Sequence, residues 1–261
     1  LDDTLLNHDL TISPRTVSAL RAAAARGIFV VICSGRAESG ILPFVRRLDI
    51  AGLQTGRYVI ALNGAVVFDL HTRRALRSKK LDGGVLFEIF CEAEKRGLCP
   101  QVYDDSTIYA SIDTKWSRLD SDISGLPLKV VDDFPSFLKR GYAKMLISAD
   151  PKAIDDFIPV LREKFSGKAD FFISKPFFLE VMPPNSGKGE AVLYLARTLG
   201  IERSETMAFG DSMNDESMLR MAAYGVAMSN GLPQIRDAAA YVTRKSNDED
   251  GIADFLEAFV L

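Results

Sequence analysis

The chain has 261 residues, of which 47% are hydrophobic and 26% charged, and a formal net charge of −3 at pH 7. This length and composition suit one or two ordinary globular domains, each with a sizeable core. The small negative charge argues against nucleic acid or an anionic membrane as the main partner, and we expect neither.

The cysteines and the apolar stretches indicate the compartment. Cys33, Cys91 and Cys99 show no CxxC spacing, which is typical of buried thiols in a reducing environment. The nearest approach to a membrane span carries Arg21 and Arg26 and is broken by a glycine. We therefore expect a cytoplasmic protein, and the sequence does not indicate its oligomeric state.

The first 80 residues alternate between helix and strand patterns. Ser13 followed by Pro14 is typical of a helix start, and Gly27 is a stop signal. The apolar run "IFVVIC" is typical of a parallel strand covered on both faces. In chain order we expect a helix over 14–26, a strand over 28–33, a helix to about 48, a strand over 58–62 and a hairpin over 63–76.

The same alternation returns in the last third of the chain. The pattern predicts helices over 188–199 and from about 214, 232 and 251, with strands over 206–210, 224–228 and 239–243. Strands that alternate with helices predict the α/β class, with a doubly wound parallel sheet.

The middle of the chain follows a different pattern, in which a helix followed by strands occurs twice. The pattern predicts helices over 83–97 and 151–165, strand pairs over 99–112 and 169–183, and a single strand over 144–149. The flanking stretches "SKKLDGG" and "PPNSGKG" are typical of linkers. We expect an α+β domain of residues 82–184 inserted into a core domain of residues 1–81 and 185–261.

Polar residues follow the predicted core strands, where ligands bind in open α/β sheets. Ser34, Gly35 and Arg36 follow the first strand. Lys188 opens a helix after a glycine-rich linker, where its charge could meet a phosphate that faces the helix N–H groups. Taken alone, Ser34 fits an ordinary cap and Lys188 an exposed linker residue.

An acidic group follows the predicted strand "TMAFG". Asp211 ends the strand, and Asn214 and Asp215 lie at the first turn of the next helix. One carboxylate there would be explained by helix capping. Two carboxylates and an amide at a ligand-binding edge also suit Mg²⁺, which favours one or two carboxylates, water and substrate phosphate.

Together these stretches resemble a known family. "LDDTLL", "VVICSGR", "SGKGEAV" and "FGDSMNDESML", in this order, resemble the four motifs of the haloacid dehalogenase-like superfamily, and more narrowly its Cof-type phosphatases. The resemblance extends to "ALNGAVV", "GVAMSNG" and "VTRKSNDEDGIADFLE". A large α+β cap inserted between the second and third motifs is also a feature of the Cof-type group.

The resemblance implies an aspartyl-phosphate mechanism. Asp2 matches the second aspartate of the first motif, Asp3 a position often held by glycine, and Thr4 the motif's threonine. The nucleophilic aspartate would immediately precede Leu1. It would attack phosphorus, while Asp2 protonates the leaving alcohol and then activates water.

The resemblance also implies roles for the remaining site residues. The expected cofactor is Mg²⁺, held by Asp211, by Asp215 as a second ligand or an anchor, and by the backbone carbonyl of Asp2. The expected substrate-binding residues are Ser34, Gly35, Arg36, Asn63, Lys188 and Asn214, of which Ser34 and Lys188 are also catalytic.

Specificity is the least determined feature. In the inserted domain Asp104, Asp105 and Lys129 are candidates, although a solvated surface role suits each better, and Trp116 suits packing. The expected function is Mg²⁺-dependent hydrolysis of small phosphorylated metabolites, with sugar phosphates foremost. The alternatives are a phosphomutase with a related core and cap, and a non-catalytic protein that binds a phosphorylated ligand.

Overall fold

The computed structural model describes residues 1–104 and 106–261 and divides into two compact units. The core unit comprises Leu1–Arg77 and Gly187–Leu261, and the inserted unit comprises Ser78–Ser186. Each unit has its own apolar core. Among the described residues, no helix combines the length and apolarity needed to cross a membrane.

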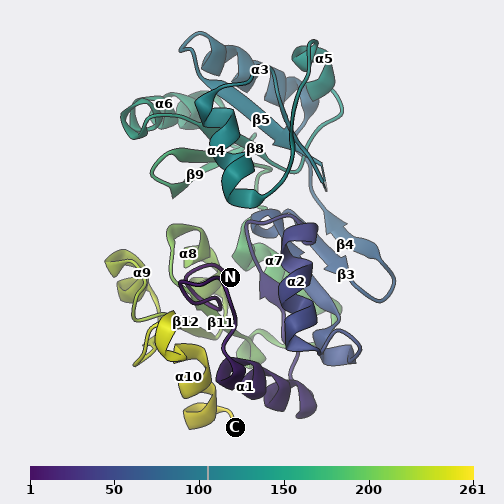
Figure 1. The fold of residues 1–261 in the computed structure, drawn as a ribbon, viewed down its shortest axis with the longest axis vertical. Helices are drawn as coiled ribbons and strands as arrows, with labels where there is room; N and C mark the ends of the chain where they lie inside the picture. Colours follow the sequence, from purple (N-terminus) through teal and green to yellow (C-terminus); the bar gives the residue numbers. More distant parts are fainter. Residues whose placement is uncertain (105) are drawn as a thin grey trace. The chain divides into compact units, whose positions relative to one another are not determined.

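The core unit alternates helices and strands along most of its length (Figure 1). Its helices are α1 (Pro14–Ala25), α2 (Glu38–Leu48), α7 (Lys188–Thr198), α8 (Glu216–Met221), α9 (Pro233–Ala238) and α10 (Gly251–Phe259). Its strands are β1 (Ile32–Cys33), β2 (Tyr58–Ala61), β3 (Val66–Asp69), β4 (Arg74–Ser78), β11 (Met207–Gly210), β12 (Tyr224–Ala227) and β13 (Tyr241–Val242). Short 3-10 turns are η1 (Gln54–Gly56), η2 (Leu62–Gly64), η3 (Arg203–Glu205), η4 (Met213–Asp215) and η5 (Asn247–Glu249).

The core strands form two sheets, in the orders β1-β2-β3-β4 and β11-β12-β13. β1 pairs with β2 in parallel, and β11, β12 and β13 are all parallel, so the predicted α/β class is confirmed. The expected strand over 28–33 is shorter than predicted, because only Ile32 and Cys33 pair with β2. The strand expected over 239–243 is likewise reduced to Tyr241–Val242.

The first helix begins as its sequence predicts. Ser13 Oγ accepts a hydrogen bond from the Thr16 backbone N–H, Pro14 is the first helical residue, and Gly27 follows the helix with a φ of 88°. The first helix, purple in Figure 1, packs beside the yellow last helix, α10. The two ends of the chain therefore support each other within the core unit.

An apolar cavity of about 570 Å³ borders the facing edge strands of the two core sheets. Val31 and Cys33 contribute to its wall from the β1 side, and Met207 and Phe209 from the β11 side. Leu1 also lines this cavity.

The inserted unit is an antiparallel-rich sheet with helices packed against both of its faces. Its helices are α3 (Gly83–Glu94), α4 (Lys115–Ser124), α5 (Phe134–Leu138) and α6 (Pro151–Lys164). Its strands β5 (Cys99–Tyr103), β6 (Ile108–Ala110), β7 (Leu128–Val130), β8 (Met145–Ser148), β9 (Asp170–Lys175) and β10 (Phe178–Met182) have the order β7-β6-β5-β8-β10-β9. α4, β7 and α5 were not expected from the sequence pattern, and they interrupt its two-fold repeat of a helix followed by strands.

Candidate active site

Four loops of the core unit bring the polar residues predicted for the site to the carboxyl ends of strands or the start of a helix. Ser34 follows β1, Asn63 follows β2 and Asp211 follows β11, while Lys188 is the first residue of α7. All nine predicted site residues belong to this unit: Asp2, Ser34, Gly35, Arg36, Asn63, Lys188, Asp211, Asn214 and Asp215.

Lys188 and Asp215 form a buried ion pair, with Lys188 Nζ 2.5 Å from Asp215 Oδ1. Asp215 Oδ2 accepts hydrogen bonds from the backbone N–H groups of Asp211 (3.0 Å) and Ser212 (3.2 Å). Burial opposes both charges, but each partner favours the charge of the other, so the pKa of Lys188 is raised and that of Asp215 is lowered. The pair therefore carries both charges at neutral pH.

Asp211 is in a different electrostatic environment from Asp215. Burial, followed by the nearby Asp215 carboxylate, raises the pKa of Asp211 to about 6. Thr4 Oγ1 donates a hydrogen bond to Asp211 Oδ1. Because Asp215 is already neutralised by Lys188, Asp211 is the carboxylate of the two that lacks a cationic side-chain partner among the described residues.

Asp2 is paired with Arg36 in a bidentate contact. Arg36 Nε lies 3.1 Å from Asp2 Oδ2, and Nη2 lies 2.5 Å from Oδ1. Burial acts to raise the pKa of Asp2, but the contacts with Arg36 outweigh it, and the net effect lowers that pKa. The guanidinium also lies 5.5 Å from the ring centroid of Phe44, so Arg36 is held from two sides.

Ser34, Gly35 and Asn63 form a closely packed corner of the site. Ser34 Oγ accepts from the backbone N–H of Arg36 (3.2 Å), and the Ser34 carbonyl accepts from Asn63 N–H (2.9 Å). A Cβ on Gly35 would lie 3.0 Å from Asn63 Oδ1, so a side chain at this position would displace the amide. Asn63 is buried, and its Oδ1 accepts from Asn214 Nδ2 (3.0 Å).

The segment Leu1–Thr4 is held at this charged cluster. Leu1 is buried, and its carbonyl accepts hydrogen bonds from the N–H groups of Leu5 (2.9 Å) and Leu6 (3.0 Å). Asp2 pairs with Arg36 and Thr4 binds Asp211, so this segment joins two parts of the site.

The residues present fit a small hard cation in part. Asp211 offers a buried carboxylate with a raised pKa, as expected of an anion that a cation would stabilise. The carboxylate of Asp2 is engaged with Arg36, and both oxygens of Asp215 have partners. Among the described residues no three acidic, histidine or cysteine side chains cluster as a complete ligand set, so a cation held here would need backbone carbonyls, water or substrate as further ligands.

The candidates in the inserted unit are described by their contacts within that unit. Asp104 accepts hydrogen bonds from the backbone N–H groups of Ser106 and Thr107 and from Tyr109 Oη, which gives it a local role in a turn. Lys129 is exposed on β7, and Asp105 lies outside the described residues. Trp116 is half-buried on α4, where the Lys115 ammonium lies 4.8 Å from its ring.

Two residues that contact the site were not among the predicted site residues. Thr4 binds Asp211, although the sequence motif already contained this threonine. Asn230, in the stretch "GVAMSNG", donates from Nδ2 to the Asp3 carbonyl at 2.8 Å. Its only signal in the sequence is its place in a stretch that extends the family resemblance.

Comparison with known proteins gives the family. A family model described as haloacid dehalogenase-like hydrolase matches residues 1–256. YxeH of Bacillus subtilis, whose name provisionally calls it a phosphatase, is 31% identical over 265 residues, which span 100% of this chain and 96% of that protein. YwtE of the same organism, a 5-amino-6-(5-phospho-D-ribitylamino)uracil phosphatase, is 28% identical over 98% of this chain and 95% of its own.

A solved structure agrees with this assignment. A haloacid dehalogenase-like hydrolase from Bacteroides thetaiotaomicron superposes with a TM-score of 0.87 at 29% identity, covering 99% of this chain and 96% of that one. The chain belongs to the haloacid dehalogenase-like hydrolases. Within them it is a Cof-type enzyme of the phosphoric monoester hydrolase class, as its sequence predicted.

Proposed function

We propose that this phosphatase hydrolyses small phosphorylated metabolites with Mg²⁺, through an aspartyl-phosphate formed on an aspartate that immediately precedes Leu1. The observation that carries the proposal is the position of the segment after Leu1, in which Asp2 pairs with Arg36 and Thr4 binds Asp211. A residue bonded to the Leu1 nitrogen would therefore lie near the groups proposed to act on the phosphate and to hold the metal.

The apolar cavity between β1 and β11 supports the same proposal. Its walls come in part from β1 and β11, which are edge strands of the two core sheets and each pair in parallel with a neighbour, and Leu1 lies on its lining. A further parallel strand of apolar residues that leads into Leu1 would satisfy the unpaired edges and fill the cavity. Its last residue would then lie at the carboxyl end of the strand, beside Ser34 and Asp211.

In the proposed first step, a carboxylate oxygen of the preceding aspartate attacks phosphorus, and the bond between phosphorus and the leaving oxygen breaks. Asp2 gives its proton to that oxygen. In the second step, Asp2 takes a proton from water, the water oxygen attacks phosphorus, and inorganic phosphate and the free aspartate result. Because Arg36 holds Asp2 as a carboxylate, Arg36 must release it before the first step.

Lys188 and Ser34 are proposed to hold the phosphoryl oxygens while charge shifts. Lys188 is a buried, fully charged donor whose position is fixed by Asp215, which suits it to stabilise negative charge in a low-dielectric site. Asp211 is the proposed Mg²⁺ ligand, with Asp215 an anchor for the lysine and the loop. The bound cation would offset the repulsion between an anionic nucleophile and an anionic phosphate.

The substrate proposed for first testing is a sugar phosphate or a similar polyol phosphate. YwtE is named for a substrate with a phosphorylated ribityl chain, and it is 28% identical to this chain. A Serratia proteamaculans relative, also 28% identical, is named an HMP-PP phosphatase. These two relatives are equally similar to this chain but are named for different substrates. Together they therefore support only a class of substrate, the small phosphate esters. The cytoplasmic location stays a prediction.

The alternatives differ in where the phosphoryl group goes. A phosphomutase would return it to a substrate hydroxyl, and a binding protein would not transfer it. The test is hydrolysis of an aryl phosphate by the full-length protein with Mg²⁺ and with the metal chelated, using the Asp211→Asn variant as a control. Release of inorganic phosphate that requires both Mg²⁺ and Asp211 supports a phosphatase. With a sugar phosphate as substrate, return of the phosphoryl group to a different sugar hydroxyl without release of inorganic phosphate would favour the mutase.

A further inference from the structure

One turn of the core unit touches both loops that carry the proposed catalytic carboxylates. The turn is formed by residues 228–232, which follow β12. Its Leu232 N–H donates to the Asp211 carbonyl (2.9 Å), and its Asn230 Nδ2 donates to the Asp3 carbonyl (2.8 Å). The turn also packs closely on Asp211, since a Cβ on Gly231 would lie 3.1 Å from the Asp211 Cα.

The segment that Asn230 binds has a strained backbone. Asp3 has a φ of 55°, in the left-handed region that residues other than glycine seldom adopt. On one side of it, Asp2 is paired with Arg36, and on the other, Thr4 binds Asp211. The conformation of Asp3 therefore decides how far apart Asp2 and Asp211 are held, and the hydrogen bond from Asn230 stabilises that conformation.

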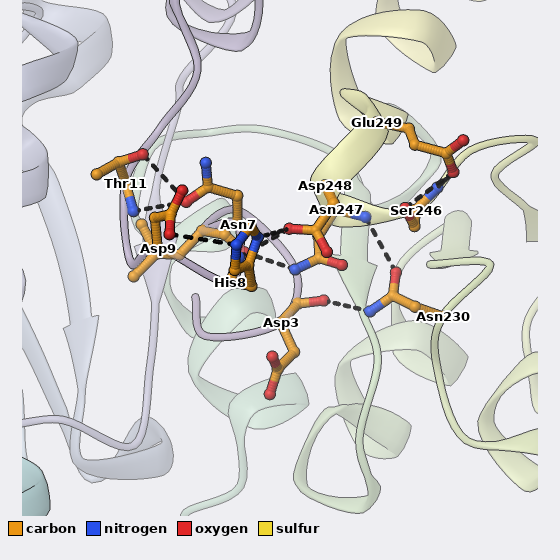
Figure 2. A network of polar contacts seen from close by, with 11 residues as sticks. Asp3, Asn7, His8, Asp9, Thr11, Asn230, Ser246, Asn247, Asp248 and Glu249 are labelled. Carbon is orange, nitrogen blue, oxygen red and sulfur yellow. Dashed lines mark hydrogen bonds and ion pairs between the residues drawn. The ribbon is translucent and has the colours of Figure 1, made fainter.

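Asn230 is itself oriented by a second asparagine, Asn247 (Figure 2). The Asn247 N–H donates to Asn230 Oδ1 (3.1 Å), which leaves Asn230 Nδ2 directed at Asp3. Asn247 Nδ2 donates in turn to the Leu6 carbonyl (2.8 Å). Two C-terminal stretches that supply no residue to the proposed chemistry thus bind the backbone of the first motif at two points.

We propose that Asn230 is a positioning residue for phosphoryl transfer, which holds the Asp2–Thr4 segment at a fixed distance from Asp211. The inference rests on the proposed function. Asn230 is exposed, and the contacts described for it are with main-chain groups and Asn247, so it acts through Asp3. Loss of its donor removes no proposed catalytic group but lets the Asp2–Thr4 segment shift, and a small misplacement of reacting groups lowers turnover.

The test compares Asn230→Ala with Asn230→Asp in the full-length protein, with an aryl phosphate as substrate. Aspartate keeps the Oδ1 acceptor for Asn247 N–H but has no donor for the Asp3 carbonyl. We expect both variants to lose kcat by roughly 10- to 100-fold, with KM changed by less than about threefold. Turnover by Asn230→Asp at the wild-type rate would overturn the inference, since the link to Asn247 alone would then be sufficient.

A second variant separates positioning from general loss of stability. Glycine adopts a positive φ without strain, so Asp3→Gly removes the need for the hydrogen bond that stabilises it. We compare the fold-loss of kcat that Asn230→Ala causes in two backgrounds. We expect this fold-loss to be at least about three times smaller in the Asp3→Gly background than in the wild type. Equal losses in both backgrounds would show that Asn230 does not act through Asp3.

His8→Ala is the matched control. The His8 ring lies 3.2 Å from Asp248, so its removal also loosens the N-terminal loop against residues 246–250, but it leaves Asp3 untouched. We expect kcat of this variant to stay within about twofold of the wild type. If His8→Ala and Asn230→Ala lose kcat equally, a nonspecific loosening explains both. Absence of turnover in the wild-type protein would instead defeat the proposed function.

Discussion

Lys188 and Asp215 are each other's main electrostatic partners, 2.5 Å apart and both less than 6% exposed. The remaining oxygen of Asp215 binds the backbone of the loop that carries Asp211. A single buried carboxylate thus fixes both the position of the proposed phosphate-binding lysine and the path of the loop with the proposed metal ligand. Substitutions can separate the contribution of Lys188 to catalysis from its contribution to the stability of the fold.

We predict that Lys188→Met lowers kcat/KM by at least 100-fold, about 3 kcal/mol, as for the loss of an oxyanion donor. It should also lower the free energy of unfolding by about 3–5 kcal/mol, because Asp215 becomes an unpaired buried charge. Steady-state kinetics and urea unfolding measure the two effects.

The double variant Lys188→Met with Asp215→Asn is the control for this prediction. Removing the second charge should restore most of the free energy of unfolding and none of the activity. Activity that returns together with stability would mean that Lys188 serves the fold alone.

We predict that Gly35→Ala lowers kcat/KM by roughly tenfold, about the value of one hydrogen bond. The new Cβ would lie 3.0 Å from Asn63 Oδ1, so the Asn63 amide must rotate and lose its bond with Asn214. The loss should be smaller in an Asn214→Ala background, where that bond is already absent.

Gly52→Ala is the matched control for this substitution, because no atom lies within 4 Å of a Cβ at Gly52. This variant should keep the wild-type kcat/KM. Equal losses for Gly35→Ala in the two backgrounds would contradict the role given to the contact between Asn63 and Asn214.

Glu92 should make the inserted unit sensitive to acid. Its hydrogen bonds with Lys164 and Lys95 lower its pKa to about 2. Since the folded pKa is below the unfolded one, the stabilisation is present above the ordinary pKa near 4.5 and is lost as the pH falls toward 2. We predict that Glu92→Gln lowers the midpoint temperature of thermal unfolding at pH 7. Below pH 5 this midpoint should fall less steeply with decreasing pH in the variant than in the wild type.

Asp156→Asn provides the comparison for Glu92. Asp156 forms an exposed pair with Lys152 on the surface of α6, and such pairs contribute little. The midpoint temperature of the Asp156→Asn variant should therefore follow that of the wild type between pH 3 and pH 7. A Glu92→Gln variant that declines as steeply as the wild type would rule out this account of acid sensitivity.

Much of the fold follows from local sequence signals. Ser13 and Pro14 begin α1 where the pattern places it, and the parallel strands of the tail follow from buried apolar runs. α4 was missed because its stretch is largely polar, although Thr114 and Ser117 form a capping box that was a usable signal. β1 was predicted too long because its length depends on a pairing partner, which a local pattern does not contain.

The candidate site was predictable residue by residue but not as a set of contacts. Ser34 and Asp211 could be found because they end strands at one edge of the fold. The pairs of Lys188 with Asp215 and of Asp2 with Arg36 join residues 27 and 34 positions apart, and only the folded chain brings them together. Asn230 was not found because it acts through a backbone carbonyl, for which its residue type gives no signal.

The most direct test of the central claim is to locate the phosphoryl group on the full-length enzyme during turnover. The protein is quenched in acid within one turnover of a phosphate ester, the acyl phosphate is reduced with borohydride, and the modified residue is identified by peptide mass spectrometry. We expect one modified carboxylate, on the residue bonded to the nitrogen of Leu1. Turnover with modification at a different residue, or with no phosphorylated carboxylate at all, would contradict it.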